Sequence, residues 1–118
     1  MKNKLVISSL FLLIVSCFHR KEPKITIINN SGNLYDSIKV FTSVNKPTLF
    51  YNVKSKSIVN GKILFDESNK SDGCYKILLY QKDSLKLNNC FGYYTNGASL
   101  NYKFDIKIEK DSLIIDGH

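Results

Sequence analysis

The sequence predicts an all-β protein, folded as a small antiparallel β-sandwich. From residue 24 onward, Val, Ile, Tyr, Phe and Thr dominate the apolar and β-branched positions, and these residues are enriched in strands. No segment repeats apolar residues at the i, i+3, i+4 and i+7 spacing of an amphipathic helix. Turn-forming residues recur roughly every ten to twelve residues, which is the spacing typical of a sandwich. The chain should therefore consist of strands and turns.

About eight short strands follow from this pattern, each an apolar segment bounded by turn residues. Their expected ranges are residues 24–29, 38–44, 48–53, 62–65, 75–81, 85–94, 100–108 and 113–116. The expected turns lie at residues 29–32, 45–47, 60–61, 66–73 and 95–97, where Asn, Gly, Asp and Pro gather. A domain over residues 24–118 with this strand spacing is immunoglobulin-like in general architecture.

The clearest strand signal covers residues 100–108, where apolar and polar side chains alternate strictly. Alternation of period two places the two sets on opposite faces of a strand. We expect the face with the lysines to contact solvent and the other face to be buried. The buried face would consist of Leu100, Tyr102, Phe104, Ile106 and Ile108.

A four-residue pattern marks two of the expected hairpin turns. The sequence Lys-Asp-Ser-Leu at residues 82–85 recurs at residues 110–113, each time just before an apolar strand. Asp and Ser side chains hydrogen-bond the local backbone in turns. We interpret the pattern as a recurring turn and not as a repeat architecture.

The first seventeen residues have the layout of a secretory signal. Lys2 and Lys4 precede an apolar stretch, residues 5–15, which is followed by the small residue Ser16. As a helix this stretch of about eleven residues would span about 16 Å, roughly half of a 30 Å hydrocarbon core. The sequence therefore disfavours a transmembrane helix at this position.

Residues Ile14-Val15-Ser16-Cys17 resemble the lipobox of bacterial lipoproteins. In that motif an aliphatic residue, a small or β-branched residue and then Gly, Ala or Ser precede an invariant cysteine. The resemblance implies cleavage after Ser16, a diacylglycerol lipid on Cys17 and, usually, acylation of the new amino terminus. Phe18 stands where some lipoproteins carry the aspartate that retains them in the inner membrane, so the outer membrane is favoured. The resemblance covers residues 1–17, and the mature domain resembles no family that we can name.

The resemblance divides the chain into a signal peptide (1–16), a lipidated cysteine with a basic tether (17–23) and a β-sandwich (24–118). The tether reaches at most about 25 Å, which keeps the domain close to its membrane. His19, Arg20, Lys21 and Lys24 cluster beside the anchor, where each Lys or Arg gains about 1 kcal/mol against anionic lipid. We expect a lipid-anchored protein of the bacterial cell envelope, facing the periplasm or the cell surface.

The charge of the chain does not indicate a nucleic-acid partner. The formal charge of +7 falls to +5 once residues 1–16, with two lysines and no acid, are removed. Most remaining lysines alternate with apolar residues along the expected strands, as on the solvated face of a half-buried sheet. We therefore expect no nucleic acid among its partners.

Two cysteines remain if Cys17 carries the lipid. Cys74 opens one expected strand and Cys90 lies in the next, so a hairpin turning near residues 81–83 would bring them opposite each other. Because disulfides persist outside the cytoplasm, we expect a Cys74–Cys90 disulfide. The alternative is a pair of reduced, buried cysteines. Without a nearby histidine the two cysteines match a zinc site poorly.

No catalytic, cofactor or metal site is predicted. The two histidines, His19 and His118, lie in the tether and at the terminus, where a folded core would not orient them. A Ser-His-Asp or Cys-His site cannot be assembled from such positions. The acidic residues fall mostly at turns beside lysines. We expect a protein that is not an enzyme.

The remaining candidate site is the aromatic and glycine-rich segment 91–97. Tyr93 and Tyr94 are consecutive, so one should face the core and the other solvent. An exposed tyrosine near Asn96 can contact a protein or a glycan, and packing alone is the alternative. The sequence thus predicts an envelope binding or scaffolding module of unknown ligand. The alternative function is a lipidated inhibitor or immunity protein against a secreted toxin or hydrolase.

Overall fold

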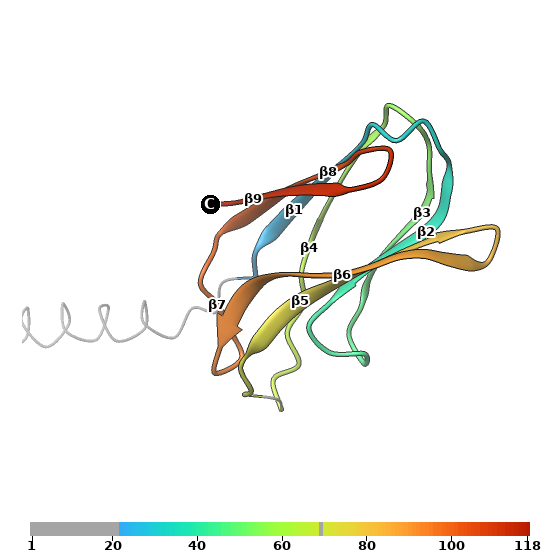
Figure 1. The fold of residues 1–118 in the computed structure, drawn as a ribbon. Helices are drawn as coiled ribbons and strands as arrows, with labels where there is room; N and C mark the ends of the chain where they lie inside the picture. Colours follow the sequence, from blue (N-terminus) through green and yellow to red (C-terminus); the bar gives the residue numbers. More distant parts are fainter. Residues whose placement is uncertain (1–21, 69) are drawn as a thin grey trace, which may run out of the picture.

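The structure, a computed structural model, describes residues 22–68 and 70–118. These residues form nine strands: β1 (Lys24–Asn29), β2 (Tyr35–Phe41), β3 (Thr48–Val53), β4 (Ile58–Lys62), β5 (Gly73–Gln81), β6 (Ser84–Thr95), β7 (Ala98–Ser99), β8 (Lys103–Ile108) and β9 (Leu113–Gly117). The strands pack as a sandwich, which confirms the predicted fold class (Figure 1). No helix able to cross a membrane is found in the described part of the chain.

The strands are divided between two sheets. Sheet A has the order β4-β1-β8-β9, and sheet B has the order β3-β2-β5-β6-β7. All pairs are antiparallel except β1 and β8, which run parallel with Lys24 beside Lys103. A parallel pair needs a long crossover, and here sheet B and β4 supply it. The parallel pair therefore joins the first strand to the carboxyl-terminal hairpin.

The core lies between the sheets, where their inward side chains meet. In β8, Phe104, Ile106 and Ile108 are buried while Lys107 is exposed, which confirms the alternation predicted for these residues. Burial of such side chains is the main favourable term in folding. The core cluster consists of Ile25, Ile27, Tyr35, Ile38, Val40, Val53, Ile63, Phe65, Tyr75, Ile77, Leu79, Phe91, Tyr94, Phe104, Ile106 and Ile108.

Two residues of the expected buried face lie outside the strand. Leu100 and Tyr102 are 63% and 64% exposed, and β8 begins only at Lys103, where pairing with β1 starts. The Ser99 hydroxyl donates to the carbonyl oxygen of Asn101 and accepts from its N–H, which turns the chain between β7 and β8. The prediction was wrong for these two residues because sequence alternation continues past the point where pairing ends.

The fourth strand lies earlier in the chain than predicted. Asn60 and Gly61, expected to form a turn, lie inside β4, and residues 63–65 follow the strand. A Cβ atom at Gly61 would lie 2.8 Å from Cζ of Phe50, so the glycine makes room for the Phe50 ring. The preceding turn lies at residues 54–57, where Lys56 has a φ of 63°.

Other strand limits differ less from the expected ones. β2 begins at Tyr35 and ends at Phe41, three residues earlier at each end than predicted, and the short strand β7 was not predicted. The KDSL turns are confirmed. In the first, Lys82 and Asp83 have φ values of 50° and 60°, as a two-residue hairpin turn requires. In the second, the N–H of Glu109 donates to the carbonyl oxygen of Ser112.

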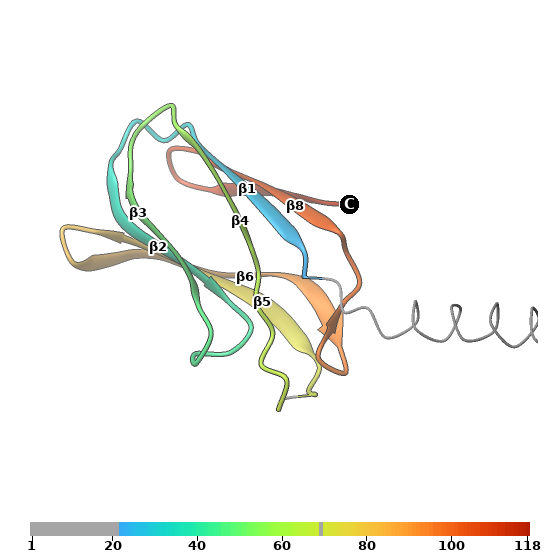
Figure 2. The ribbon, with the colours of Figure 1, turned by 180° about the vertical axis from the view of Figure 1, so that it is seen from behind.

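The first described residues and the carboxyl terminus lie at the same end of sheet A. The N–H of Lys24 donates to the carbonyl oxygen of Tyr102 at 2.9 Å, and the N–H of His118 donates to that of Lys103 at 2.8 Å. The N–H of Ile63 donates to the carbonyl oxygen of Pro23. Both ribbon views place the β5–β6 turn at the end of the molecule away from the first described residues (Figure 1, Figure 2).

Candidate functional site

The two consecutive tyrosines of β6 have different surroundings, as predicted. Tyr94 is 7% exposed and Tyr93 is 49% exposed. The Tyr94 ring packs against Phe65 and Tyr75, with ring centroids 5.5 and 5.3 Å apart. Tyr94 is therefore a packing residue, and Tyr93 is the one that a ligand can reach.

Asn96 lies in the β6–β7 turn with a φ of 50°. Its N–H donates to Oδ1 of Asp72 at 2.7 Å, and the N–H of Gly97 donates to the carbonyl oxygen of Ser71. These bonds hold the turn against the loop before β5. Because Tyr94 belongs to the core, the three predicted residues do not form one exposed surface.

Tyr75 is the centre of the aromatic cluster beneath this turn. Its ring centroid lies 5.0 to 6.1 Å from those of Phe65, Phe91, Tyr94 and Phe104. Its hydroxyl donates to Oγ of Ser99 at 2.8 Å. Burial raises the pKa of the Tyr75 hydroxyl, which keeps it protonated as a donor. The cluster therefore supports β7 and the adjoining loops.

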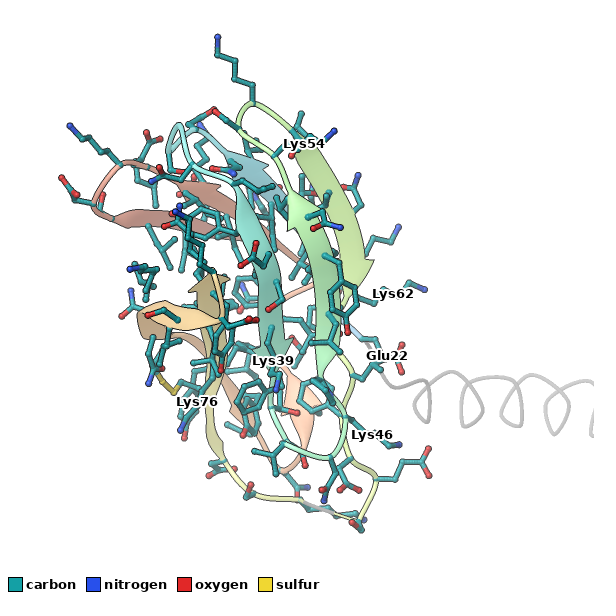
Figure 3. All side chains as sticks on the ribbon, turned by 90° about the vertical axis from the view of Figure 1, so that its right-hand side faces the viewer. Glu22, Lys39, Lys46, Lys54, Lys62 and Lys76 are labelled. Carbon is teal, nitrogen blue, oxygen red and sulfur yellow. A yellow bond between two sulfur atoms is a disulfide. The ribbon has the colours of Figure 1, made fainter. Side chains whose placement is uncertain are left out.

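Cys74 and Cys90 lie at disulfide distance, with their Cα atoms 5.8 Å apart. Lys76 is the register partner of Cys90, so the two cysteines form a diagonal pair across β5 and β6. Figure 3 shows the sulfur atoms beside the labelled Lys76. Cys90 is exposed and Cys74 is partly buried, so the alternative of a buried pair is wrong.

The outer face of sheet B carries an aromatic surface that the sequence analysis missed. Ser37 of β2 pairs with Tyr51 of β3 on one side and with Tyr80 of β5 on the other. The available signal was Leu49-Phe50-Tyr51, a run of three apolar residues that places apolar side chains on both faces of the strand. The hollow here has a volume of about 360 Å³, and its lining, which we name the tyrosine surface, consists of Ser37, Lys39, Leu49, Tyr51, Tyr80 and Asp83.

A row of basic residues crosses the outer face of sheet A at the end where the described chain begins. Lys24 of β1 pairs in register with Lys62 of β4 and with Lys103 of β8. Register partners on neighbouring strands point to the same face. His118, after β9, exchanges backbone hydrogen bonds with Lys103. We name Lys62, Lys24, Lys103 and His118 the basic row.

Asp105 contacts the β8–β9 side of the basic row. Its Oδ1 lies 3.2 Å from Nζ of Lys103, and its Oδ2 lies 3.1 Å from Nε2 of His118. The hydrogen bond from Lys103 holds the pKa of Asp105 below its ordinary value, and His118 adds to the effect. His118 lies outside the core, as predicted, and its ring contacts Asp105 at the surface.

Several predicted features fall on residues that the structure does not describe. The lipobox, the lipidation site Cys17 and the tether residues His19, Arg20 and Lys21 lie outside the described residues. Over residues 22–68 and 70–118, no three His, Cys, Asp or Glu side chains converge in a way that could hold a metal ion.

No protein-family model, no curated protein and no solved structure matches the chain at a significant level.

Proposed function

We propose that this protein is a bacterial lipoprotein, held at a membrane by lipid on Cys17, whose β-sandwich binds an envelope component without catalysis. The observation that carries the proposal is Ile14-Val15-Ser16-Cys17 after a basic and apolar leader. All four positions fit a lipobox. Two or more acyl chains would anchor the protein stably, since each buried CH₂ adds about 0.8 kcal/mol and a single chain is marginal.

The position of the domain along the chain supports an anchored arrangement. β1 begins at Lys24, immediately after residues 17–23. That tether extends at most about 25 Å, so a lipid on Cys17 would hold the Lys24 end of sheet A near the bilayer. The β5–β6 turn lies at the far end of the domain (Figure 1). A partner of the anchored protein would therefore reach that end most easily.

The tyrosine surface is the binding site that we propose for an envelope protein or glycan. It includes Asp83 of the β5–β6 turn, so it extends toward the end away from the proposed anchor. Tyr51 is 66% exposed, and its ring supplies apolar contact area. Ser37, Lys39 and Asp83 supply hydrogen-bonding groups around the rings, which is the composition of a recognition site.

Mass spectrometry of the protein purified from detergent-solubilised membranes tests the anchor. The mature chain should begin at Cys17 and carry the mass of a diacylglyceryl group. The Cys17→Ser variant should leave the membrane fraction in high salt. A different amino terminus, or a Cys17→Ser variant that still cofractionates with membranes in high salt, contradicts the anchor.

Capture of partners from solubilised envelopes tests the binding site. Wild type should retain an envelope protein or glycan, and Tyr51→Ser should lose it. Tyr102→Ser is the matched control, because Tyr102 is 64% exposed at the other end of the domain. Loss with Tyr93→Ser alone would move the site to Tyr93. Stoichiometric capture and inhibition of one toxin or hydrolase would contradict the scaffold and establish the inhibitor or immunity role.

A further inference from the structure

We infer that the basic row binds the phosphate groups of anionic phospholipids and so fixes the orientation of the domain on the bilayer. The inference rests on the proposed lipid anchor and adds a second, reversible contact to it. Its first support is an unfavourable arrangement in the free domain. Lys24 has a lysine as register partner on each side, Lys62 and Lys103. Like charges directly opposite each other destabilise a sheet, and a bound anion relieves the repulsion.

The acidic residues nearby leave half of the basic row unpaired. Asp105 pairs with Lys103 and His118, whereas neither Lys24 nor Lys62 forms an ion pair within the described residues. Asp116, the register partner of Asp105, adds its charge on β9. Positive charge therefore gathers on β4 and β1, and the negative charge of this face lies on β8 and β9.

The basic row borders a hollow whose lining suits a phosphate diester. The hollow has a volume of about 460 Å³ and is lined by residues of β4, β1 and β8, including Lys24, Lys62 and Lys103. Within its lining the Thr26 hydroxyl donates to Oδ1 of Asn60 at 2.8 Å, so the Asn60 NH₂ group remains as a donor. Three ammonium groups and an amide NH₂ are all donors, and phosphate oxygens are strong acceptors.

Exposed apolar side chains adjoin the basic row at the same end of the domain. Leu100 and Tyr102 are 63% and 64% exposed, and the carbonyl oxygen of Tyr102 accepts from the N–H of Lys24. Tyrosine beside lysine is typical of a membrane interface, where rings lie at headgroup level and lysine stems extend toward phosphates.

The sequence that leads into the basic row contains one acidic residue and several basic ones. Figure 3 shows Glu22 and Lys62 on the side of the domain where the described chain begins, and Glu22 is exposed. Arg20 and Lys21 precede Glu22 in the sequence and add positive charge to the tether. An anionic bilayer is therefore the phosphate source that the charge pattern and the proposed anchor both favour.

Single tryptophans can report the orientation, because the sequence contains no tryptophan. Tyr102→Trp places the reporter beside the basic row, and Tyr51→Trp, at a residue 66% exposed on sheet B, is the matched control. The mature lipidated chain is reconstituted in phosphatidylcholine vesicles with or without phosphatidylglycerol, with brominated acyl chains as quenchers. We expect quenching of Tyr102→Trp only when phosphatidylglycerol is present, and little quenching of Tyr51→Trp.

Removal of two lysines tests the basic row itself. In the Tyr102→Trp background, Lys24→Gln with Lys62→Gln should lower the ratio of docked to undocked protein about 25-fold, since each lysine contributes about fivefold at an anionic surface. Lys76→Gln with Lys107→Gln removes the same charge at two exposed lysines outside the basic row and should leave most of the quenching. Equal loss in the two pairs would show an effect of net charge alone and overturn the inference.

The remaining outcomes separate the inference from the proposed anchor. Failure to float with pure phosphatidylcholine vesicles contradicts the anchor itself. Flotation with equal quenching at both reporter positions contradicts only the inference. Loss of quenching on adding several millimolar inorganic phosphate at constant ionic strength would identify free phosphate as the occupant and likewise overturn membrane docking.

Discussion

The side-chain NH₂ group of Asn29 donates a hydrogen bond of 3.1 Å to the carbonyl oxygen of Val53, and so connects β1 of sheet A to β3 of sheet B. Asn29 is fully buried. The same NH₂ group donates to the carbonyl oxygen of Asn33, and Oδ1 accepts from the N–H and hydroxyl of Ser31. One amide therefore fixes the β1–β2 loop against the end of β3.

Replacement of Asn29 by alanine should destabilise the domain strongly. The buried carbonyl of Val53 and the partly buried one of Asn33 would lose their donor, and the expected loss in the free energy of unfolding is about 2–4 kcal/mol. Urea denaturation measures it. Asn30→Ala is the matched control, because the Asn30 side chain is exposed, and it should stay within about 0.5 kcal/mol of wild type. Equal effects in the two variants would contradict the role of the Asn29 amide.

Two glycines separate the cost of a positive φ from the cost of a close contact. Gly92 has a φ of 60°, and a Cβ atom there would lie 2.9 Å from Cζ of Phe104 and from Cδ2 of Tyr75. Gly32 has a φ of 80° with open space around it. Gly92→Ala should therefore cost about 3 kcal/mol or more and Gly32→Ala about 1 kcal/mol. Thermal melts of the two variants compare them, and similar Tm values would show that packing at Gly92 is loose.

Local patterns predicted strands well where the pattern and the burial coincide, as at Phe104. They failed at Gly61, because Asn60-Gly61 is a turn signal on local grounds. The reason for glycine there is the ring of Phe50, which packs against it from another strand. When the role of a residue depends on a partner that is distant in the sequence, the neighbouring residues do not predict it.

The dependence on distant partners also explains which parts of the candidate surfaces could be predicted from the sequence. The alternation rule separated Tyr93 from Tyr94 correctly, because it depends on neighbours in the chain. The basic row was missed because Lys24, Lys62 and Lys103 meet only through the pairing of β4, β1 and β8. The sequence of a single strand does not predict which strands pair with it. A row of residues that depends on this pairing therefore cannot be predicted from one segment.

Phe104 and Lys107 test the two faces of β8. Phe104 is 2% exposed and packs against the rings of Tyr75 and Phe91, so Phe104→Ala should cost about 3–5 kcal/mol. Lys107 is exposed, so Lys107→Glu should change the free energy of unfolding by less than about 0.5 kcal/mol. Chemical denaturation of both variants provides the comparison. Comparable losses would mean that both faces of β8 are buried.

Asp105 should contribute to the acid sensitivity of the domain. Its pKa is lowered in the folded state, chiefly by the hydrogen bond from Lys103, so its contribution is present above the unfolded pKa of about 3.9 and is lost as the pH falls through the folded pKa. Asp105→Asn should therefore lose less stability than wild type between about pH 5 and pH 2. The pKa of Asp66 is also lowered, by hydrogen bonds from Ser68. Because Asp66 is present in wild type and in Asp105→Asn, the difference between the two proteins reports on Asp105.

Thermal melts across this pH range measure the difference. Lys103→Gln removes the donor instead of the acid and should flatten the pH dependence in the same direction. Curves of Tm against pH that run parallel for wild type and both variants would contradict the contribution of this pair.

Reduction of the Cys74–Cys90 pair should lower the stability of the domain. The cysteines are 16 residues apart, and closing a loop of that length stabilises a chain by about 3 kcal/mol in the chain-entropy model. In a domain of this size that corresponds to a fall in Tm of roughly 10 °C or more.

Cys74→Ser with Cys90→Ser should melt like the reduced wild type and should not respond to reductant. Because Cys90 is exposed, reductant has access to the pair without unfolding. Peptide mapping without reduction identifies the bond, and recovery of both cysteines as free thiols from the native protein would contradict it.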